Sequence, residues 1–358
     1  MKPSPVACSI DLAAPGKHVG HLLLSWSNVA HAYGVIPVPI AVIARGEGPT
    51  VLVSAGVHGD EYEGLAIARR LIAEIGPKDI TGRLIVMPAM NLPAVRARIR
   101  TSPIDNVNLN RAFPGGHDGP SGMIADFVER RILPQCQYAL DLHSGGTQSI
   151  YVPCGYIYQL GTEEFRAKKL AAAHAFGAPW TVTVAATSSG GSLSAAAERH
   201  GVVLVATELA GGAILDREAL RIGWDGTLNF LRYAGVLAGP IEATRTSLRK
   251  VAGATCYVMA TMDGLFEPTV EIGDEVEVGE IAGRIWPMDD LTRQPEIQRF
   301  SSAGTVICKR TMPMVIRGDY LFHTGSKVSD ASFITDNAHR STFEPTPLAG
   351  AGGNAPMD

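Results

Sequence analysis

The chain has 358 residues, of which 46% are hydrophobic and 18% charged, a balance that is typical of a folded globular protein and excludes a wholly disordered or collagen-like chain. The formal net charge is −4 and no long basic run occurs, so we expect no nucleic-acid partner. Prolines interrupt the N-terminal segment, and no uninterrupted run of about 18 apolar residues follows, so we expect neither a signal peptide nor a membrane span. The sequence therefore predicts a cytoplasmic protein with one large domain or two.

The first two thirds of the chain have an α/β pattern. From about residue 36 to 237, short apolar β-branched runs alternate with segments of helical period, which is typical of a mostly parallel or mixed sheet. Several runs are apolar at every position, as expected for strands covered by helices on both faces. The predicted strands cover residues 37–44, 50–57, 83–90, 137–143, 179–186 and 201–208. The predicted helices span residues 63–75, 121–133 and 216–237.

The pattern changes after Gly239 and Pro240. Short alternating strands separated by Gly-Asp and Gly-Glu turns predict a small all-β module, which resembles the barrel-sandwich hybrid of lipoyl and biotinyl carriers. Its hairpin segment, residues 286–292, lacks the acceptor lysine of those carriers, so we interpret the module as structural. The predicted organisation is an α/β domain, a β-rich module and a flexible tail, over residues 1–240, 241–330 and 331–358.

A histidine and a glutamate follow the second predicted strand, three residues apart. His58 and Glu61 stand where the apolar run gives way to small and polar residues before the next helix. Imidazole nitrogen and carboxylate oxygen are suitable zinc donors, at about 2.0–2.2 Å, and catalytic zinc usually takes three protein ligands. Because this spacing often arises by chance, the interpretation as a metal site needs a third ligand.

A third donor ends another predicted strand. His143 closes the apolar run 137–143 and precedes Ser-Gly-Gly. The carboxyl ends of parallel strands share the edge of an α/β sheet at which ligands bind, so His143 can converge with His58 and Glu61. Asp141 lies two residues earlier on the same strand face, where it would either orient a ligand or form a salt bridge in the core.

Two further segments carry polar residues of chemical interest. The loop that begins at Arg100 contains Asn110 and Arg111, which could hold a carboxylate or a developing oxyanion; without other context it would be a surface loop. Glu208 ends the last predicted strand, where a lone carboxylate needs a cationic partner or a chemical role. Beside a metal ion, that role would be general base and acid.

Taken in chain order, these motifs closely resemble the succinylglutamate desuccinylase and aspartoacylase family of the zinc carboxypeptidase superfamily. The resemblance covers residues 36 to about 330 and rests on four ordered motifs, namely His58-Gly-Asp-Glu61, Asn108-Leu-Asn110-Arg111, Asp141-Leu-His143 and Thr207-Glu208-Leu. It implies a zinc-carboxypeptidase-like fold with one Zn²⁺ per chain, held by His58, Glu61 and His143.

The same resemblance implies roles for the remaining polar residues. Glu208 would be the general base and acid, and Asn110 with Arg111 would bind a substrate carboxylate. The scissile carbonyl would be polarised by one of three neighbouring arginines, with Arg100 favoured over the two alternatives, Arg96 and Arg98.

Within the family, the sequence is most similar to deacetylases of ectoine catabolism that hydrolyse N-alpha-acetyl-L-2,4-diaminobutyrate. This similarity implies a zinc-dependent amidohydrolase with a small N-acyl amino acid as substrate. Three alternatives remain: a deacylase of N-acetylaspartate or N-succinylglutamate type, a metallocarboxypeptidase and, less favoured, a metal-free binding protein. Residues 148–161 follow the His143 motif and could shape the acyl or side-chain pocket. The possible pocket residues are Trp26, His31, Cys154 and Tyr156, although packing or surface positions are more common for such residues. The sequence leaves self-association open.

Overall fold

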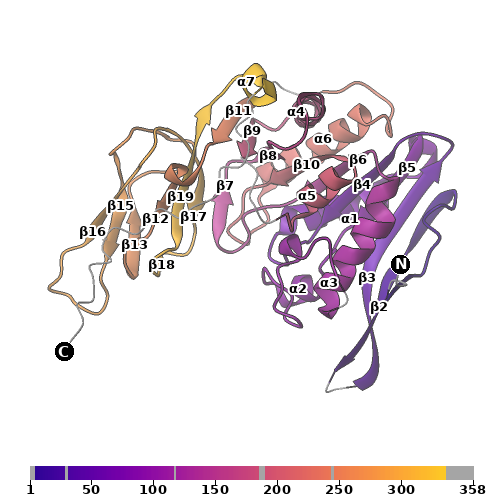
Figure 1. The fold of residues 1–358 in the computed structure, drawn as a ribbon, viewed down its shortest axis with the longest axis horizontal. Coiled ribbons are helices and arrows are strands. Elements are labelled where there is room, and N and C mark those ends of the chain that lie inside the picture. Colours follow the sequence, from indigo (N-terminus) through magenta and orange to yellow (C-terminus); the bar gives the residue numbers. More distant parts are fainter. Residues whose placement is uncertain (1–4, 29–30, 117, 185–189, 243–245, 336–358) are drawn as a thin grey trace.

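A computed structural model describes residues 5–28, 31–116, 118–184, 190–242 and 246–335. Within these ranges a 15-stranded mixed sheet runs through the molecule, and a separate four-stranded antiparallel sheet lies at its far end (Figure 1). The predicted fold class, an α/β sheet covered by helices and followed by a small β module, is confirmed. None of the helices in the described ranges is both long and apolar enough to cross a membrane.

Four neighbouring parallel strands form the centre of the large sheet. Their order is β5 (Gly82–Met87), β4 (Thr50–Ala55), β6 (Tyr138–Leu142) and β10 (Val203–Glu208), and each overlaps a strand predicted from the sequence. Asp141 of β6 is level with Ser54 of β4 on one side and with Ala206 of β10 on the other. The segments that follow β4, β6 and β10 therefore leave the same edge of the sheet.

Alternate side chains of these strands enter two separate apolar cores. In β4, Val51 and Val53 belong to one core and Leu52 belongs to the other. The first core is closed by α1 (Tyr62–Glu74), α4 (Glu163–Phe176) and α6 (Arg217–Tyr233). The second is closed by α3 (Gly119–Phe127), α5 (Leu193–Arg199) and the N-terminal strands. Burial on both faces explains why these strands are apolar at almost every position.

Several elements extend or add to the predicted set. The N-terminal strands are β1 (Val6–Cys8), β2 (Gly16–Asn28) and β3 (His31–Arg45), of which the sequence predicted only the C-terminal part of β3. Unpredicted elements include α2 (Leu92–Ala97), β7 (Ser149–Tyr151) and β8 (Cys154–Tyr158), in addition to α4 and α5. The helix predicted over 121–133 is α3 followed by a π-helical segment, Val128–Ile132.

The large sheet continues past the boundary predicted at residue 240. β11 (Ser247–Val251) pairs in parallel with β9 (Trp180–Val184), and β19 (Tyr320–Lys327) pairs with β11. β19 also contacts β17 (Gly304–Arg310) and β12 (Tyr257–Met259), and β17 pairs with β14 (Glu275–Val276). The four-stranded sheet has the order β16 (Glu296–Arg299), β15 (Ile281–Trp286), β13 (Gly264–Pro268) and β18 (Met314–Val315). The domain boundaries themselves stay predictions.

The segment predicted as a tail begins with a helix. α7 (Asp330–Thr335) buries Phe333, whose side chain joins the first apolar core. Residues 336–358 of the predicted tail lie outside the described residues.

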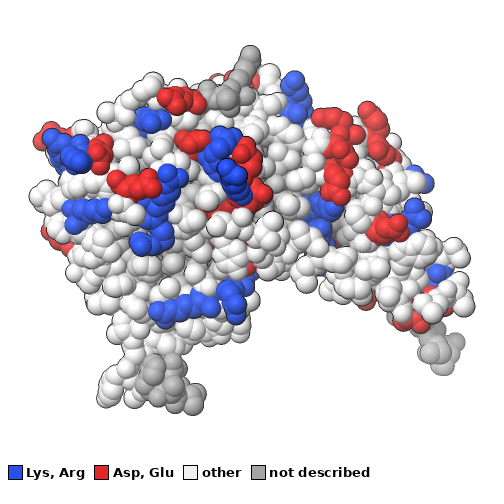
Figure 2. Space-filling view, turned by 180° about the vertical axis from the view of Figure 1, so that it is seen from behind, with Lys and Arg blue, Asp and Glu red and all other residues white. Residues whose placement is uncertain are grey.

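Charged side chains of both signs are interspersed on the face of the molecule drawn in Figure 2. Several exposed charges pair within a helix, as Arg221 does with Glu218 at 2.6 Å and with Asp225 at 3.0 Å. Such pairs add little to stability. On this face, the described basic residues alternate with acidic ones instead of forming a continuous stripe.

Candidate metal centre

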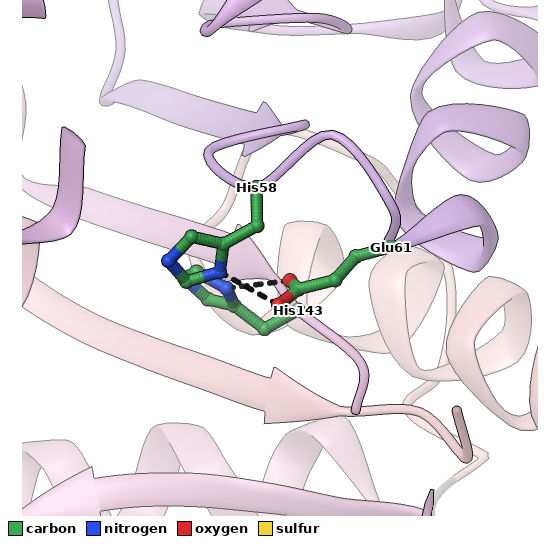
Figure 3. A group of neighbouring side chains, drawn as sticks. All are labelled: His58, Glu61 and His143. Atoms are coloured by element: carbon green, nitrogen blue, oxygen red, sulfur yellow. Dashed lines mark hydrogen bonds and ion pairs between the residues drawn. The ribbon is translucent and has the colours of Figure 1, made fainter. Parts of the chain in front are cut away.

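The three predicted ligands meet at one point. His58, Glu61 and His143 each offer a donor atom, and these atoms lie within 4.8 Å of one another. Nδ1 of His58 is 2.6 Å from Oε1 of Glu61, and Nδ1 of His143 is 2.8 Å from Oε2 of the same carboxylate (Figure 3). The exposed fractions of the three residues are only 2%, 2% and 6%. The cluster is therefore a buried set of two nitrogen donors and one carboxylate.

The local backbone brings this set together. His58 lies in the loop after β4, Glu61 directly precedes α1, and His143 directly follows β6. The loop between the first two ligands passes very close to α2, because a Cβ atom on Gly59 would lie 2.0 Å from the carbonyl oxygen of Ala94. Only glycine leaves room for that approach, so the glycine of the His-Gly-Asp-Glu motif is required by packing.

The far side of each imidazole ring also has a partner. Nε2 of His143 is 2.8 Å from Oδ2 of Asp141, and Nε2 of His58 is 3.1 Å from Oδ1 of Asn108. Ser54 donates a hydrogen bond to the other oxygen of Asp141 at 2.7 Å. Because carboxylate and amide oxygens accept hydrogen bonds, each ring can donate from Nε2, so that Nδ1 faces the Glu61 carboxylate and can bind a metal ion in place of a proton. Asp141 thus contacts the candidate ligand His143, and this contact is compatible with both of the roles predicted for Asp141.

Electrostatics favour a cation at this point. Burial alone would lower the pKa of His143, but the carboxylates of Asp141 and Glu61 raise it well above its usual range. The two carboxylates thus stabilise positive charge on the His143 ring, whereas burial lowers the pKa of His58. Two imidazole nitrogens and one carboxylate oxygen, with partners holding the rings in place, form the donor set of a catalytic zinc site.

Glu208 lines the same cavity as the three candidate ligands. It ends β10, between β6 and β8. Its Oε2 atom is buried and has no hydrogen-bond partner among the described residues. Burial, and then the nearby Glu61 carboxylate, raise the pKa of Glu208 well above its usual range. A carboxyl group in this state can accept and release a proton nearer to neutral pH, as a general base and acid must.

The predicted carboxylate and oxyanion binders line the cavity as well. Nη1 of Arg100 lies 3.5 Å from Oε1 of Glu61, whereas Arg96 and Arg98 are absent from the described cavity lining. Oδ1 of Asn110 accepts a hydrogen bond from the backbone N–H of Leu193 at 3.0 Å, which leaves the amide nitrogen as a donor. Arg111 is exposed, and its Nη1 donates to the backbone oxygen of Asn110 at 2.7 Å.

The cavity has a volume of about 320 Å³ and an aromatic wall that the sequence revealed only in part. Tyr156, a candidate from the segment after His143, belongs to this wall. Tyr151 and Tyr158 of the same predicted segment also line the cavity, whereas the candidate Cys154 is absent from the described lining. The remaining aromatic lining residues, Tyr320 and His323, carried no sequence signal. Asn108 was also missed as a partner of His58, although it precedes Asn110 by two residues in the same motif.

Comparison with known proteins shows the family to which the chain belongs. Residues 47–234 match the sequence model of the succinylglutamate desuccinylase/aspartoacylase catalytic domain. The chain is 37% identical over 321 residues to the N-alpha-acetyl-L-2,4-diaminobutyric acid deacetylase of Halomonas elongata, a match covering 89% of this chain and 94% of that enzyme.

Solved structures of related proteins are also similar to this chain over most of its length. The product-bound ectoine utilization protein EutE (DoeB) of Ruegeria pomeroyi is 38% identical, with a TM-score of 0.88, over 91% of this chain and 100% of that one. The succinylglutamate desuccinylase/aspartoacylase structure from Rhodobacter sphaeroides is 36% identical, with a TM-score of 0.87, over 91% and 100% of the two chains. The chain therefore belongs to the succinylglutamate desuccinylase/aspartoacylase family of amide-hydrolysing deacylases.

Proposed function

We propose that this protein is a zinc-dependent deacetylase of N-alpha-acetyl-L-2,4-diaminobutyrate. The observation that carries the proposal is one cavity in which the buried His58, Glu61 and His143 cluster meets Glu208 and two arginines. The chain is 37% identical to a deacetylase of that substrate, and the match covers 94% of the length of that deacetylase.

We expect one Zn²⁺ per chain, held by His58, Glu61 and His143. When bound there, zinc would polarise the substrate carbonyl and make a water molecule more acidic. Asp141 and Asn108 would keep the two imidazole rings oriented, since each accepts a hydrogen bond from the ring nitrogen that faces away from the cluster.

Other residues of the cavity would transfer the proton, stabilise the oxyanion and bind the substrate carboxylate. Glu208 accepts a proton from the attacking water and later delivers it to the departing amine. Arg100 donates a hydrogen bond to the oxygen that becomes negative in the transition state. Asn110 and Arg111 hold the substrate carboxylate, for which the amide donor and the guanidinium are suited.

The size of the cavity favours a small substrate over a peptide. A volume of about 320 Å³ accommodates an N-acyl amino acid, and ligand sites in proteins usually begin near this size. Efficient hydrolysis of tetrapeptides would instead support the metallocarboxypeptidase alternative.

A zinc-dependent hydrolysis screen tests the proposal. The purified protein is compared on N-alpha-acetyl-L-2,4-diaminobutyrate, N-acetylaspartate and N-succinylglutamate, with and without a chelator. We expect the first substrate to give the highest kcat/KM, with activity lost on chelation and restored by zinc. A clear preference for either acidic substrate would assign the protein to another deacylase type. Absence of metal in the purified protein, together with no activity after zinc addition, would favour a binding protein.

A further inference from the structure

One row of side chains crosses four strands of the C-terminal part of the sheet. Strand register places Tyr151 of β7 opposite Cys308 of β17, Cys308 opposite His323 of β19, and His323 opposite Tyr257 of β12. Cross-strand neighbours point to the same face of a sheet. The ring of His323 accordingly lies 4.3 Å from that of Tyr257 and 6.2 Å from that of Tyr151, measured between centroids.

His323 reaches the catalytic cavity from the C-terminal module. It lines that cavity together with Tyr151 and Tyr320, and its ring centroid is 5.1 Å from that of Tyr320. Among the described residues it has aromatic neighbours but no hydrogen-bond partner. Burial lowers the pKa of His323 to about 3, so at neutral pH the ring offers one N–H and one lone pair. The chemistry proposed above does not use this residue.

Charges are unequally distributed around the cavity. The described basic residues that line it are Arg100 and Arg111, on the side of the metal ligands and the carboxylate binders. A substrate ammonium would be repelled by these guanidinium groups and cannot accept their hydrogen bonds. The ammonium group needs hydrogen-bond acceptors and an environment that tolerates a cation. The faces of the aromatic rings in the wall provide such an environment.

Some other polar atoms of the cavity lining already have hydrogen-bond partners. The hydroxyl group of Tyr320 contacts Ser149 and lies 3.2 Å from the backbone oxygen of Gln148. Oδ2 of Asp60 accepts hydrogen bonds from the backbone and the side chain of Thr147, whereas its Oδ1 has no hydrogen-bond partner among the described residues but is buried from solvent.

From this arrangement we propose that His323 determines substrate specificity by accepting a hydrogen bond from the side-chain ammonium group of the N-acyl amino acid, with the neighbouring tyrosine rings facing the same charge. The proposal deepens the function proposed above and rests on it. It assigns to the C-terminal module a direct part in choosing a cationic substrate.

A matched pair of substrates separates this role from a structural one. N-alpha-acetyl-L-2,4-diaminobutyrate and N-acetyl-L-norvaline share the acetyl group, the carboxylate and the length of the side chain, but the second has a methyl group in place of the ammonium. His323→Phe keeps an aromatic ring and removes both nitrogens, whereas His323→Gln keeps a neutral acceptor. The holoenzyme and both variants are assayed on both substrates, and zinc content and thermal unfolding are measured alongside.

The wild-type protein should prefer the amine-bearing substrate. In the His323→Phe variant, kcat/KM for that substrate should fall about 10- to 100-fold, as for loss of a hydrogen bond to a charged group, while kcat/KM for the norvaline compound changes by less than about threefold. His323→Gln should recover part of the loss. An equal loss on both substrates, or an unchanged preference in His323→Phe, overturns the proposal. A wild-type protein that hydrolyses neither compound overturns the proposed function, and the specificity role falls with it.

Discussion

Asp141 and His143 form a pair in which the carboxylate contacts the ring nitrogen opposite the one that faces Glu61. The Nε2 to Oδ2 distance is 2.8 Å, and both residues are buried. They are two positions apart at the end of β6, so they share one face of the strand. The strand thus supplies both the candidate ligand and the acceptor that fixes its orientation.

Replacing Asp141 by Ala should weaken zinc binding about 10- to 100-fold, as is typical when the partner of a ligating histidine is removed. The reason is that the His143 ring loses the acceptor that keeps Nδ1 directed toward the cluster. Competition with a chromophoric chelator measures the affinity. Asp126→Ala is a matched control, because Asp126 is equally buried but pairs with Arg130 away from the cavity. Equal affinities for the two variants would contradict this role.

Glu208→Gln should keep the fold and the zinc content but lower kcat by about 10²- to 10⁴-fold. The amide has nearly the same shape as the carboxylate and cannot accept the proton of the attacking water. Metal analysis and circular dichroism establish that the variant is intact, and initial rates give kcat. Near wild-type turnover would show that another group is the base.

Arg100 lines the cavity, which favours it over Arg96 and Arg98 as the residue that polarises the carbonyl and leads to a prediction. Arg100→Ala should lower kcat by about 10²- to 10³-fold, which is the usual effect of removing one donor to a developing oxyanion. Arg96→Ala should have little effect, because Arg96 is exposed near the end of α2 and does not line the cavity. The two variants are compared in the same steady-state assay. A larger loss in Arg96→Ala would reverse the assignment.

The sequence predicted the metal cluster because its residues are tied to strand ends. His58, His143 and Glu208 each follow or end an apolar run, and parallel strands bring such ends to one edge. The main strands were themselves predictable, because burial on both faces requires continuous apolar runs in the sequence.

The aromatic wall could not be predicted in this way. His323 reaches the cavity only because β17 pairs with both β7 and β19, a contact between segments more than 150 residues apart. No local pattern encodes that pairing. The N-terminal hairpin was missed for a different reason: the apolar Leu23 stands between the buried Leu22 and Leu24, so the alternation typical of a strand with one buried face is obscured in the sequence.

The half-buried His323, which is held uncharged among aromatic rings, also predicts how stability depends on pH. His323 has a pKa of about 3 in the folded protein, against about 6.5 for an unperturbed histidine, so between these values the unfolded chain binds more protons than the folded one. The contribution to stability is complete above pH 6.5 and is lost as pH falls toward 3. At pH 5 the loss is about 2 kcal/mol of the free energy of unfolding.

Glutamine at position 323 does not titrate, so the His323→Gln variant should gain about 2 kcal/mol relative to wild type when the pH falls from 7 to 5. Urea unfolding at both pH values measures the difference, with a chelator present so that zinc release affects neither protein. Because the titrations of all other groups are common to both proteins, they cancel in the comparison. If His323→Gln and the wild-type protein respond to pH equally, the His323 ring is not held in the uncharged form that its aromatic neighbours favour.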